Sequence, residues 1–192
     1  MLKKITVDPE NKYFDSRDNC NAIVEKSTDS IVAGCAGTVI TDSIKYIKAG
    51  AFLGTKVEKM IIPDNVKEIG EEAFSCTAFT EFNIPDTVES VGKMCFRECE
   101  KLKKVTLSKG IKCNGDKTIL SGVFSGCISL EEITIPQNIN YIGDDMFSAC
   151  DKLTTVNIEN KNTDIGSRAF AGCVSIKDFE FSKGSIGKEA FW

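Results

Sequence analysis

The chain of 192 residues contains no histidine. Histidine is the commonest general base and a frequent metal ligand, so its absence makes an enzyme a poor hypothesis for this sequence. The chain also has no phosphate-binding loop, dinucleotide fingerprint or nucleophile elbow. We therefore expect a non-enzymatic protein with no catalytic residues, no metal and no cofactor.

Strong charge of one sign and long apolar runs are also lacking. The formal net charge is −4 and the 24 basic residues are scattered, so the sequence offers no polybasic patch that would attract nucleic acid. No apolar run approaches the length of a membrane-spanning helix, which needs about 18 residues. The first twenty residues also lack the apolar core of a signal peptide. We expect neither nucleic-acid binding nor a membrane-spanning segment.

What the chain does contain is one phrase repeated about every 22 or 23 residues. It reads IPDNVKEIGEEAF at 62–74, IPDTVESVGKMCF at 84–96 and IPQNINYIGDDMF at 135–147. The phenylalanine that ends the phrase recurs as Phe52, Phe74, Phe96, Phe124, Phe147, Phe170 and Phe191. Internal repetition at this period is typical of a solenoid, in which each coil buries its apolar side chains against its neighbours.

Each phrase is preceded by the pattern apolar-x-x-apolar-x-apolar, which predicts one strand per coil. The segments are 57–62, 79–84, 102–107, 130–135, 153–158 and 176–181, and residues 2–7 have the same form. Alternation points the last two apolar residues inward and the residue between them outward. The recurrent Ile-Gly or Val-Gly that follows predicts a corner that needs either a positive φ or a close approach of the backbone.

Two segments interrupt the repeat. Residues 20–35 read as a β-hairpin in which Ile23 and Val24 face Ile31 and Val32. Residues 113–122 read as a bulge, because five residues too many lie between Leu107 and Phe124. We find no linker, so we expect a single domain over 1–192. It would have an N-terminal coil with the hairpin insertion at 1–40, and successive repeats at 41–192.

The nine cysteines follow the repeat more than they indicate a site. Cys99, Cys127, Cys150 and Cys173 each lie three residues after the phrase phenylalanine, where a small buried side chain would pack against the next coil. Cysteines spaced along the solenoid axis do not converge on one point, as tetrahedral zinc requires. Cys20 and Cys35 differ, since the predicted hairpin places them opposite each other. A cross-strand disulfide is feasible there, although free buried thiols fit the pattern as well.

The outward strand positions form the candidate binding face. One column along the coils is Lys59, Glu81, Lys104, Glu132, Thr155 and Asp178, and its neighbour is Ile61, Asn83, Thr106, Thr134, Asn157 and Glu180. We predict that Lys59, Ile61, Glu81, Asn83, Lys104, Thr106, Glu132 and Thr134 contact a partner. The alternative is a solvated face that only maintains solubility. Neither column contains the aromatic residues that usually anchor protein interfaces.

The consensus L-x-x-I-x-I-P-x-x-V-x-x-I-G-x-x-A-F-x-x-C resembles the BspA-like leucine-rich repeat of surface proteins of Bacteroidales and other anaerobes. The likeness covers essentially the whole chain, and residues 13–40 resemble a hairpin-bearing unit of Bacteroidales members. The resemblance implies a β-rich α/β fold. It would be a right-handed leucine-rich-repeat solenoid with a parallel sheet on one face and turns or short 3-10 segments on the other, plus the hairpin insertion.

For function, the same resemblance implies a secreted or cell-surface protein that binds other proteins. Its expected role is adhesion to host extracellular matrix or to other cells, and we expect a monomer. The competing hypothesis is a structural spacer, one segment of a longer array with no ligand of its own. An extended repeat surface is compatible with both.

Overall fold

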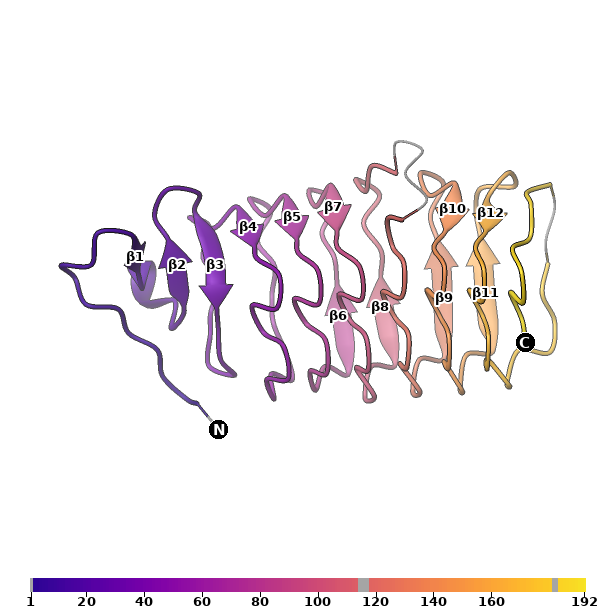
Figure 1. Ribbon diagram of the computed structural model, residues 1–192, viewed down its shortest axis with the longest axis horizontal. Coiled ribbons are helices and arrows are strands. Elements are labelled where there is room, and N and C mark those ends of the chain that lie inside the picture. The colour runs from indigo at the N-terminus through magenta and orange to yellow at the C-terminus, as the bar shows by residue number, and fades with distance from the viewer. Residues whose placement is uncertain (1, 114–117, 181–182) are drawn as a thin grey trace.

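The structure, a computed structural model, describes residues 2–113, 118–180 and 183–192. It is an elongated solenoid whose coils stack along the long axis, with the N-terminus at one end and the C-terminus at the other (Figure 1). The repeat period of the sequence is therefore the period of the coils, as predicted.

Four of the predicted segments form strands of one parallel sheet, with one strand per coil. Its members are β6 (Glu81–Asn83), β8 (Lys104–Thr106), β9 (Glu132–Ile135) and β11 (Thr155–Ile158), in the spatial order β11-β9-β8-β6. The strands leave out the first residues of their predicted segments, and β6 and β8 also leave out the last one. Residues 57–62, and the described residues 176–180, continue the column without being strands. We call the exposed side of this sheet and of residues 57–62 and 176–180 the strand face.

A second row of short parallel strands accompanies the first, where turns or short 3-10 segments were expected. It comprises β4 (Tyr46–Ile47), β5 (Glu68–Ile69) and β7 (Ser90–Val91), and further along β10 (Tyr141–Ile142) and β12 (Asp164–Ile165). Each has two residues and ends at the position before the corner glycine or, in β4, before Lys48. The two rows are visible in Figure 1. The coil is thus hydrogen-bonded to its neighbours along two lines.

The N-terminal region departs from the repeat as expected, but in a different register. It contains β1 (Phe14–Asp15), the short 3-10 helix η1 (Arg17–Asn19), β2 (Ile23–Glu25) and β3 (Ser30–Ala33). The hairpin pairs Ile23 with Ala33 and Val24 with Ile31. The predicted pairing of Ile23 with Val32 is therefore wrong, because an irregularity between Ile23 and Val24 shifts the register. Parallel pairing of β3 with β4 joins the hairpin to the solenoid.

Residues 2–7 do not form the strand that their pattern predicted. The side chain of Asn21 takes the place of a neighbouring strand. Its Oδ1 accepts from the Ile5 amide at 2.6 Å and its Nδ2 donates to the Lys3 carbonyl at 3.0 Å. The segment is extended, but a side-chain amide holds it instead of a ladder.

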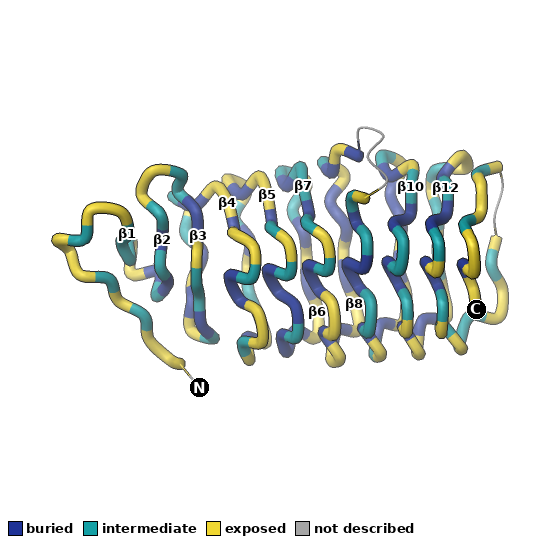
Figure 2. Tube along the Cα trace, viewed as in Figure 1, coloured by how far each residue is buried: buried dark blue, intermediate teal, exposed yellow. Residues whose placement is uncertain are grey.

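The phenylalanines of the repeat form a continuous stack through the core. Neighbouring rings from Phe52 to Phe191 lie 5.2 to 5.6 Å apart with interplanar angles of 9 to 19°. Figure 2 shows the buried positions recurring at the same place in successive coils. At the start of the stack, Gly34 leaves room for the ring of Phe52, which would lie 2.0 Å from a Cβ there. The core is one row of stacked layers, each contributed by one coil.

The corner glycines are required by close approach of the backbone. None of Gly70, Gly92, Gly143, Gly166 and Gly187 has a positive φ. A Cβ on Gly92 would lie 2.3 Å from the Glu71 amide nitrogen, and one on Gly143 would lie 2.6 Å from the Leu120 carbonyl carbon. The structure therefore explains these glycines by close approach of the backbone and not by a positive φ.

The predicted bulge at 113–122 lies partly outside the described residues, since 114–117 are not among them. On either side of that gap, Cys113 and Leu120 are buried. The chain returns to the standard coil before Phe124, which joins the ring stack.

Candidate functional site

The strand face places the predicted charge column in one line. In the parallel ladder Glu81 is the partner of Lys104, Lys104 of Glu132 and Glu132 of Thr155. All four side chains are exposed, whereas the central residue of each strand points inward, as Phe82 and Val105 do. Lys59 occupies the same slot one repeat earlier and is also exposed. The ladder therefore confirms the predicted line of Glu81, Lys104, Glu132 and Thr155. We use the name charge column for Lys59, Glu81, Lys104 and Glu132.

The neighbouring column is polar along most of its length and apolar at its N-terminal end. Asn83 pairs with Thr106 in the ladder, and Thr134 with Asn157. Ile61, one repeat earlier, is 85% exposed. Val39 holds the equivalent slot of the preceding phrase and is 62% exposed. Val39 was missed as a candidate, although aligning residues 36–52 with 58–74 would have found it.

A shallow trough crosses the strands between and beside these columns. Its first hollow, of about 500 Å³, is lined by Lys59, Glu81, Asn83, Lys104 and Thr106 among others. The second, of about 330 Å³, shares Lys104 and Thr106 with the first. The third, of about 790 Å³, shares Thr134, Thr155 and Asn157 with the second and extends to Asp178 and Glu180. The hollows therefore follow one another along the axis of the solenoid.

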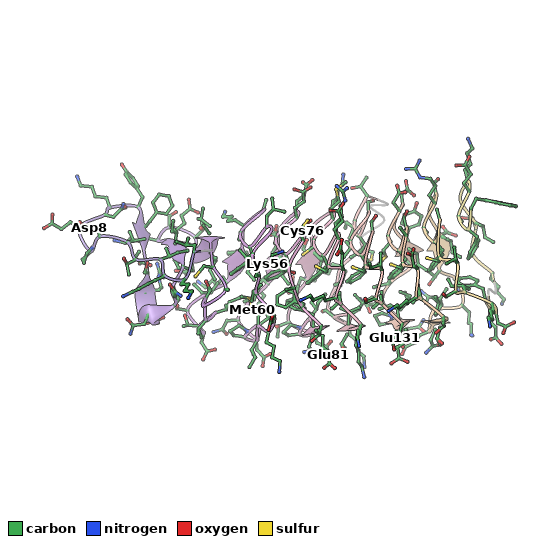
Figure 3. The ribbon with its side chains drawn as sticks, turned by 90° about the horizontal axis from the view of Figure 1, so that it is seen from below. Asp8, Lys56, Met60, Cys76, Glu81 and Glu131 are labelled. Carbon is green, nitrogen blue, oxygen red and sulfur yellow. The ribbon has the colours of Figure 1, made fainter. Side chains whose placement is uncertain are left out.

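The orientation of this face is clear when the side chains are drawn. Glu81 and Glu131 lie along the same long side of the solenoid in Figure 3, and Cys76 lies toward the other side. The three hollows are open to solvent and lined mainly by polar residues. Such a surface has the shape to bind a partner laid along it.

The four members of the charge column are unpaired. Within the part of the chain that the structure describes, none of them forms an ion pair. The chain does pair charges between coils elsewhere. Arg168 donates two hydrogen bonds of 2.8 Å to Asp145, and Lys112 pairs with Glu89. The strand face thus holds alternating charges that form no ion pair with other described residues.

The hairpin carries a separate cluster of charges that is fully paired. Asp29 accepts from Arg17 at 2.6 Å and lies 2.9 Å from the Lys45 ammonium, and Arg17 also contacts Asp15. Hydrogen bonds from Lys45 and from Arg17 lower the pKa of Asp29. These contacts tie the hairpin turn to the first coil, so we read this cluster as structural.

The repeat cysteines are packing residues, as predicted. The thiols of Cys99, Cys127, Cys150 and Cys173 donate to the carbonyls of Phe74, Phe96, Phe124 and Phe147 in the preceding coil, at 3.0 to 3.2 Å. Burial raises the pKa of Cys99 to about 11 and that of Cys127 well above its usual value. The thiols of Cys99 and Cys127 therefore stay protonated at neutral pH, which makes them poor nucleophiles. Among the described residues, no group of three or more cysteine or acidic side chains is placed to hold a metal ion.

Cys20 and Cys35 are buried free thiols in the structure. Cys20 lies 3.9 Å from the Ala22 carbonyl and Cys35 lies 3.7 Å from the Asn21 carbonyl. A bridge between them stays a prediction, and titration of thiols in denaturant tests it. All nine cysteines would react if no bridge exists, and seven if it does.

Comparison with protein families gives one match over most of the chain. Residues 34–120 and 113–192 match the model of the BspA type leucine rich repeat region, in six copies. None of the curated proteins matches the sequence. No helix in the described part of the chain has the length and apolarity needed to cross a membrane.

Several solved structures share the fold. A leucine-rich repeat protein from Eubacterium ventriosum is 24% identical with a TM-score of 0.81, over 99% of this chain and 52% of that one. One from Bacteroides ovatus is 28% identical with a TM-score of 0.66, over 83% and 48%. A leucine rich cell surface protein from Faecalibacterium prausnitzii is 27% identical with a TM-score of 0.62, over 96% and 42%. The chain spans about half the length of these proteins or less.

Proposed function

The chain belongs to the BspA-type leucine-rich-repeat family, and from that premise we propose that it is a non-enzymatic protein that binds other proteins through its strand face. It acts at the cell surface or after secretion, as a monomer, in adhesion to host extracellular matrix or to other cells. The fold supports an interaction role, because a solenoid presents an extended surface that no single compact core would offer.

The surface location is supported by a relative. The Faecalibacterium protein, 27% identical, is described as a cell surface protein. Family membership supports the adhesive role, and the identity of the partner is part of the proposal.

The observation that carries the proposal is the set of unpaired charges on the strand face. A face that served solubility alone would gain a little stability by pairing neighbouring opposite charges across its strands. Lys59, Glu81, Lys104 and Glu132 are exposed and leave that gain unused within the described residues, while Glu89 and Lys112 on another side do pair. Alternating free charges are a means of selecting a partner and its alignment.

The second candidate function is a spacer segment with no ligand. The observation in its favour is the composition of the two columns, since neither contains an aromatic side chain. Aromatic residues supply much of the binding energy at protein interfaces, and a face without them binds weakly unless its partner matches its charges.

Pulldown of purified extracellular-matrix proteins tests the two candidates. The double variant K59E/K104E reverses both lysines of the charge column, and it should lose binding while unfolding at the same temperature as the parent. The matched control K67E/K93E makes the same change in net charge at two exposed lysines away from the strand face. Binding that survives K59E/K104E excludes this face. Absence of binding to any matrix protein or cell surface favours the spacer.

A further inference from the structure

We propose that the partner segment that fits the strand face is an α-helix lying across the strands, whose contacting side alternates acidic and basic residues. This inference rests on the proposed function, since it names the kind of partner that the same face would recognise. Three observations carry it: the spacing of the charges, their order, and the apolar residue beside the first of them.

The spacing of the charge column matches a helix. Paired strands lie about 4.8 Å apart, and Lys59, one coil before β6, lines the same hollow as Glu81 and Lys104. At this coil spacing the four charges from Lys59 to Glu132 span roughly 14 Å. Helix residues at i, i+3, i+7 and i+10 lie on one side and span about 15 Å at 1.5 Å per residue. Each of the four charges of the column can therefore face one of these four helix residues.

Other backbone conformations do not stay in step. An extended strand places successive same-side residues about 6.7 Å apart, which gives roughly 20 Å over three steps. A polyproline II helix returns to the same side about every 9.3 Å, so it would meet only every second strand and only charges of one sign. Against such a partner, the alternation of basic and acidic residues from Lys59 to Glu132 would serve no purpose.

The order of the charges defines the sequence of the partner. From Lys59 to Glu132 the column reads basic, acidic, basic, acidic, so the contacting side of the helix reads acidic, basic, acidic, basic. Exposed ion pairs each contribute little to affinity. Their arrangement still discriminates between partners, because a helix in the wrong order brings like charges together.

An apolar contact lies at one end of the column. Ile61, 85% exposed, is two residues beyond Lys59, and Val39 holds the equivalent slot one repeat earlier. A helix that places a leucine beside its first acidic residue would cover Ile61. The first hollow, lined by Lys59, Glu81 and Lys104, gives the helix room to lie in the trough. This contact fixes the direction of the helix, since the far end of the neighbouring column is polar.

Two helical peptides of equal composition test the proposal. Each is alanine-based and about 18 residues long, because shorter isolated helices are marginal in water. The alternating peptide carries Glu, Lys, Glu and Lys at i, i+3, i+7 and i+10 with a leucine next to the first glutamate. The blocked peptide carries Glu, Glu, Lys and Lys at the same positions. A blocked order mismatches two of the four charges in either direction of the helix. Fluorescence anisotropy of labelled peptides should show at least tenfold tighter binding of the alternating peptide.

A variant of the protein provides the matched control. E81K/K104E changes the column to basic, basic, acidic, acidic without changing the net charge. It should reverse the preference in favour of the blocked peptide. I61S should weaken binding of both peptides severalfold. Equal affinity of both peptides for the parent protein, or the same preference in E81K/K104E, would overturn the inference.

The helical conformation is tested separately. A proline at the centre of the alternating peptide should abolish binding, because proline breaks a helix interior. If the proline peptide binds as well as its parent, an extended partner replaces the helix and the inference is wrong. Peptides that discriminate while matrix proteins fail to bind would uphold the helix and overturn only the adhesive role. Matrix binding that is lost in K59E/K104E, with no discrimination between peptides, would uphold the role and overturn the helix.

Discussion

The two sides of each coil use their residues differently. One side of the coil, which we call the corner side, holds the glycine, the phenylalanine and the cysteine of the repeat. There each coil packs against its neighbour and forms hydrogen bonds and ion pairs with it. Phe147 stacks on the rings on either side, Cys150 donates to the Phe124 carbonyl, and Arg168 pairs with Asp145. On the strand face the four charges of the charge column point outward and, among the described residues, form no ion pair. The repeat constrains the corner side and leaves the strand face available for recognition.

The largest expected loss of stability comes from removing one ring of the phenylalanine stack on the corner side. Phe147 is fully buried in the stack, so Phe147→Ala leaves a cavity and should destabilise the fold by about 3–5 kcal/mol. Thr134→Ala on the strand face should change the free energy of unfolding by less than about 0.5 kcal/mol. Urea unfolding followed by circular dichroism measures both. Equal costs at the two positions would contradict the division between the two sides.

The next effect comes from the corner glycine. Gly92→Ala would place a Cβ 2.3 Å from the Glu71 amide nitrogen, which is backbone and cannot rotate away. Forcing an extra methyl into a packed site costs about 1–3 kcal/mol. Lys93→Ala, at the exposed neighbour, should be nearly neutral and serves as the control. If Gly92→Ala were equally neutral in thermal melts, close approach would not be the reason for glycine at this corner.

Most of the fold could be predicted because the corner side repeats its constraints. Phenylalanine, glycine and cysteine recur in register, and each burial requirement is visible in the residue type itself. The second row of strands could not be predicted. Its members, such as Glu68–Ile69, have two residues, and one polar and one apolar residue carry no periodicity.

In the N-terminal region, a segment with the sequence pattern of a repeat strand does not form a strand. Residues 2–7 have the residues of a repeat strand, yet the Asn21 side chain takes the hydrogen bonds that a ladder would have used. A contact between residues 16 positions apart leaves no signal in the pattern of either segment. The register of the hairpin was wrong for a similar reason, since the irregularity at Ile23 depends on the pairing itself.

The candidate site could be predicted in its geometry and not in its electrostatics. Alternation along each strand sufficed to place Glu81, Lys104 and Glu132 in one column. That these side chains form no ion pairs with other described residues depends on rotamers, which the sequence does not specify.

A smaller effect concerns the turn after the phrase phenylalanine, where one slot has a positive φ in successive coils. Gly126 and Gly172 have φ of 75° and 76°, but Ala149 in the coil between them has φ of 56°. An L-residue there is strained by about 1–2 kcal/mol, and glycine would remove this strain. Part of that gain is lost because glycine gives the unfolded chain more conformational entropy. Ala149→Gly should therefore stabilise the protein by up to about 1 kcal/mol.

Gly172→Ala is the reciprocal test. A Cβ there would meet Ala149 at 3.5 Å, an ordinary contact, so the cost is that of φ alone. It should lower stability by about 1 kcal/mol in the same urea assay. If both substitutions changed stability in the same direction, strain at this slot would not explain them.

The smallest effect sharpens the contrast between paired and unpaired charges through pH. The hydrogen bond from Lys112 lowers the pKa of Glu89. A carboxylate with a lowered folded-state pKa adds stability above its unfolded pKa of about 4.3, and that stability is lost as pH falls through the folded value. Glu89→Gln should thus lower the melting temperature slightly at pH 7 and converge with the parent in acid. Lys112→Gln should give the same convergence, because it removes the other half of the pair. Melting curves that stay parallel to the parent from pH 7 to pH 3 in both variants would show that this pair contributes no stability.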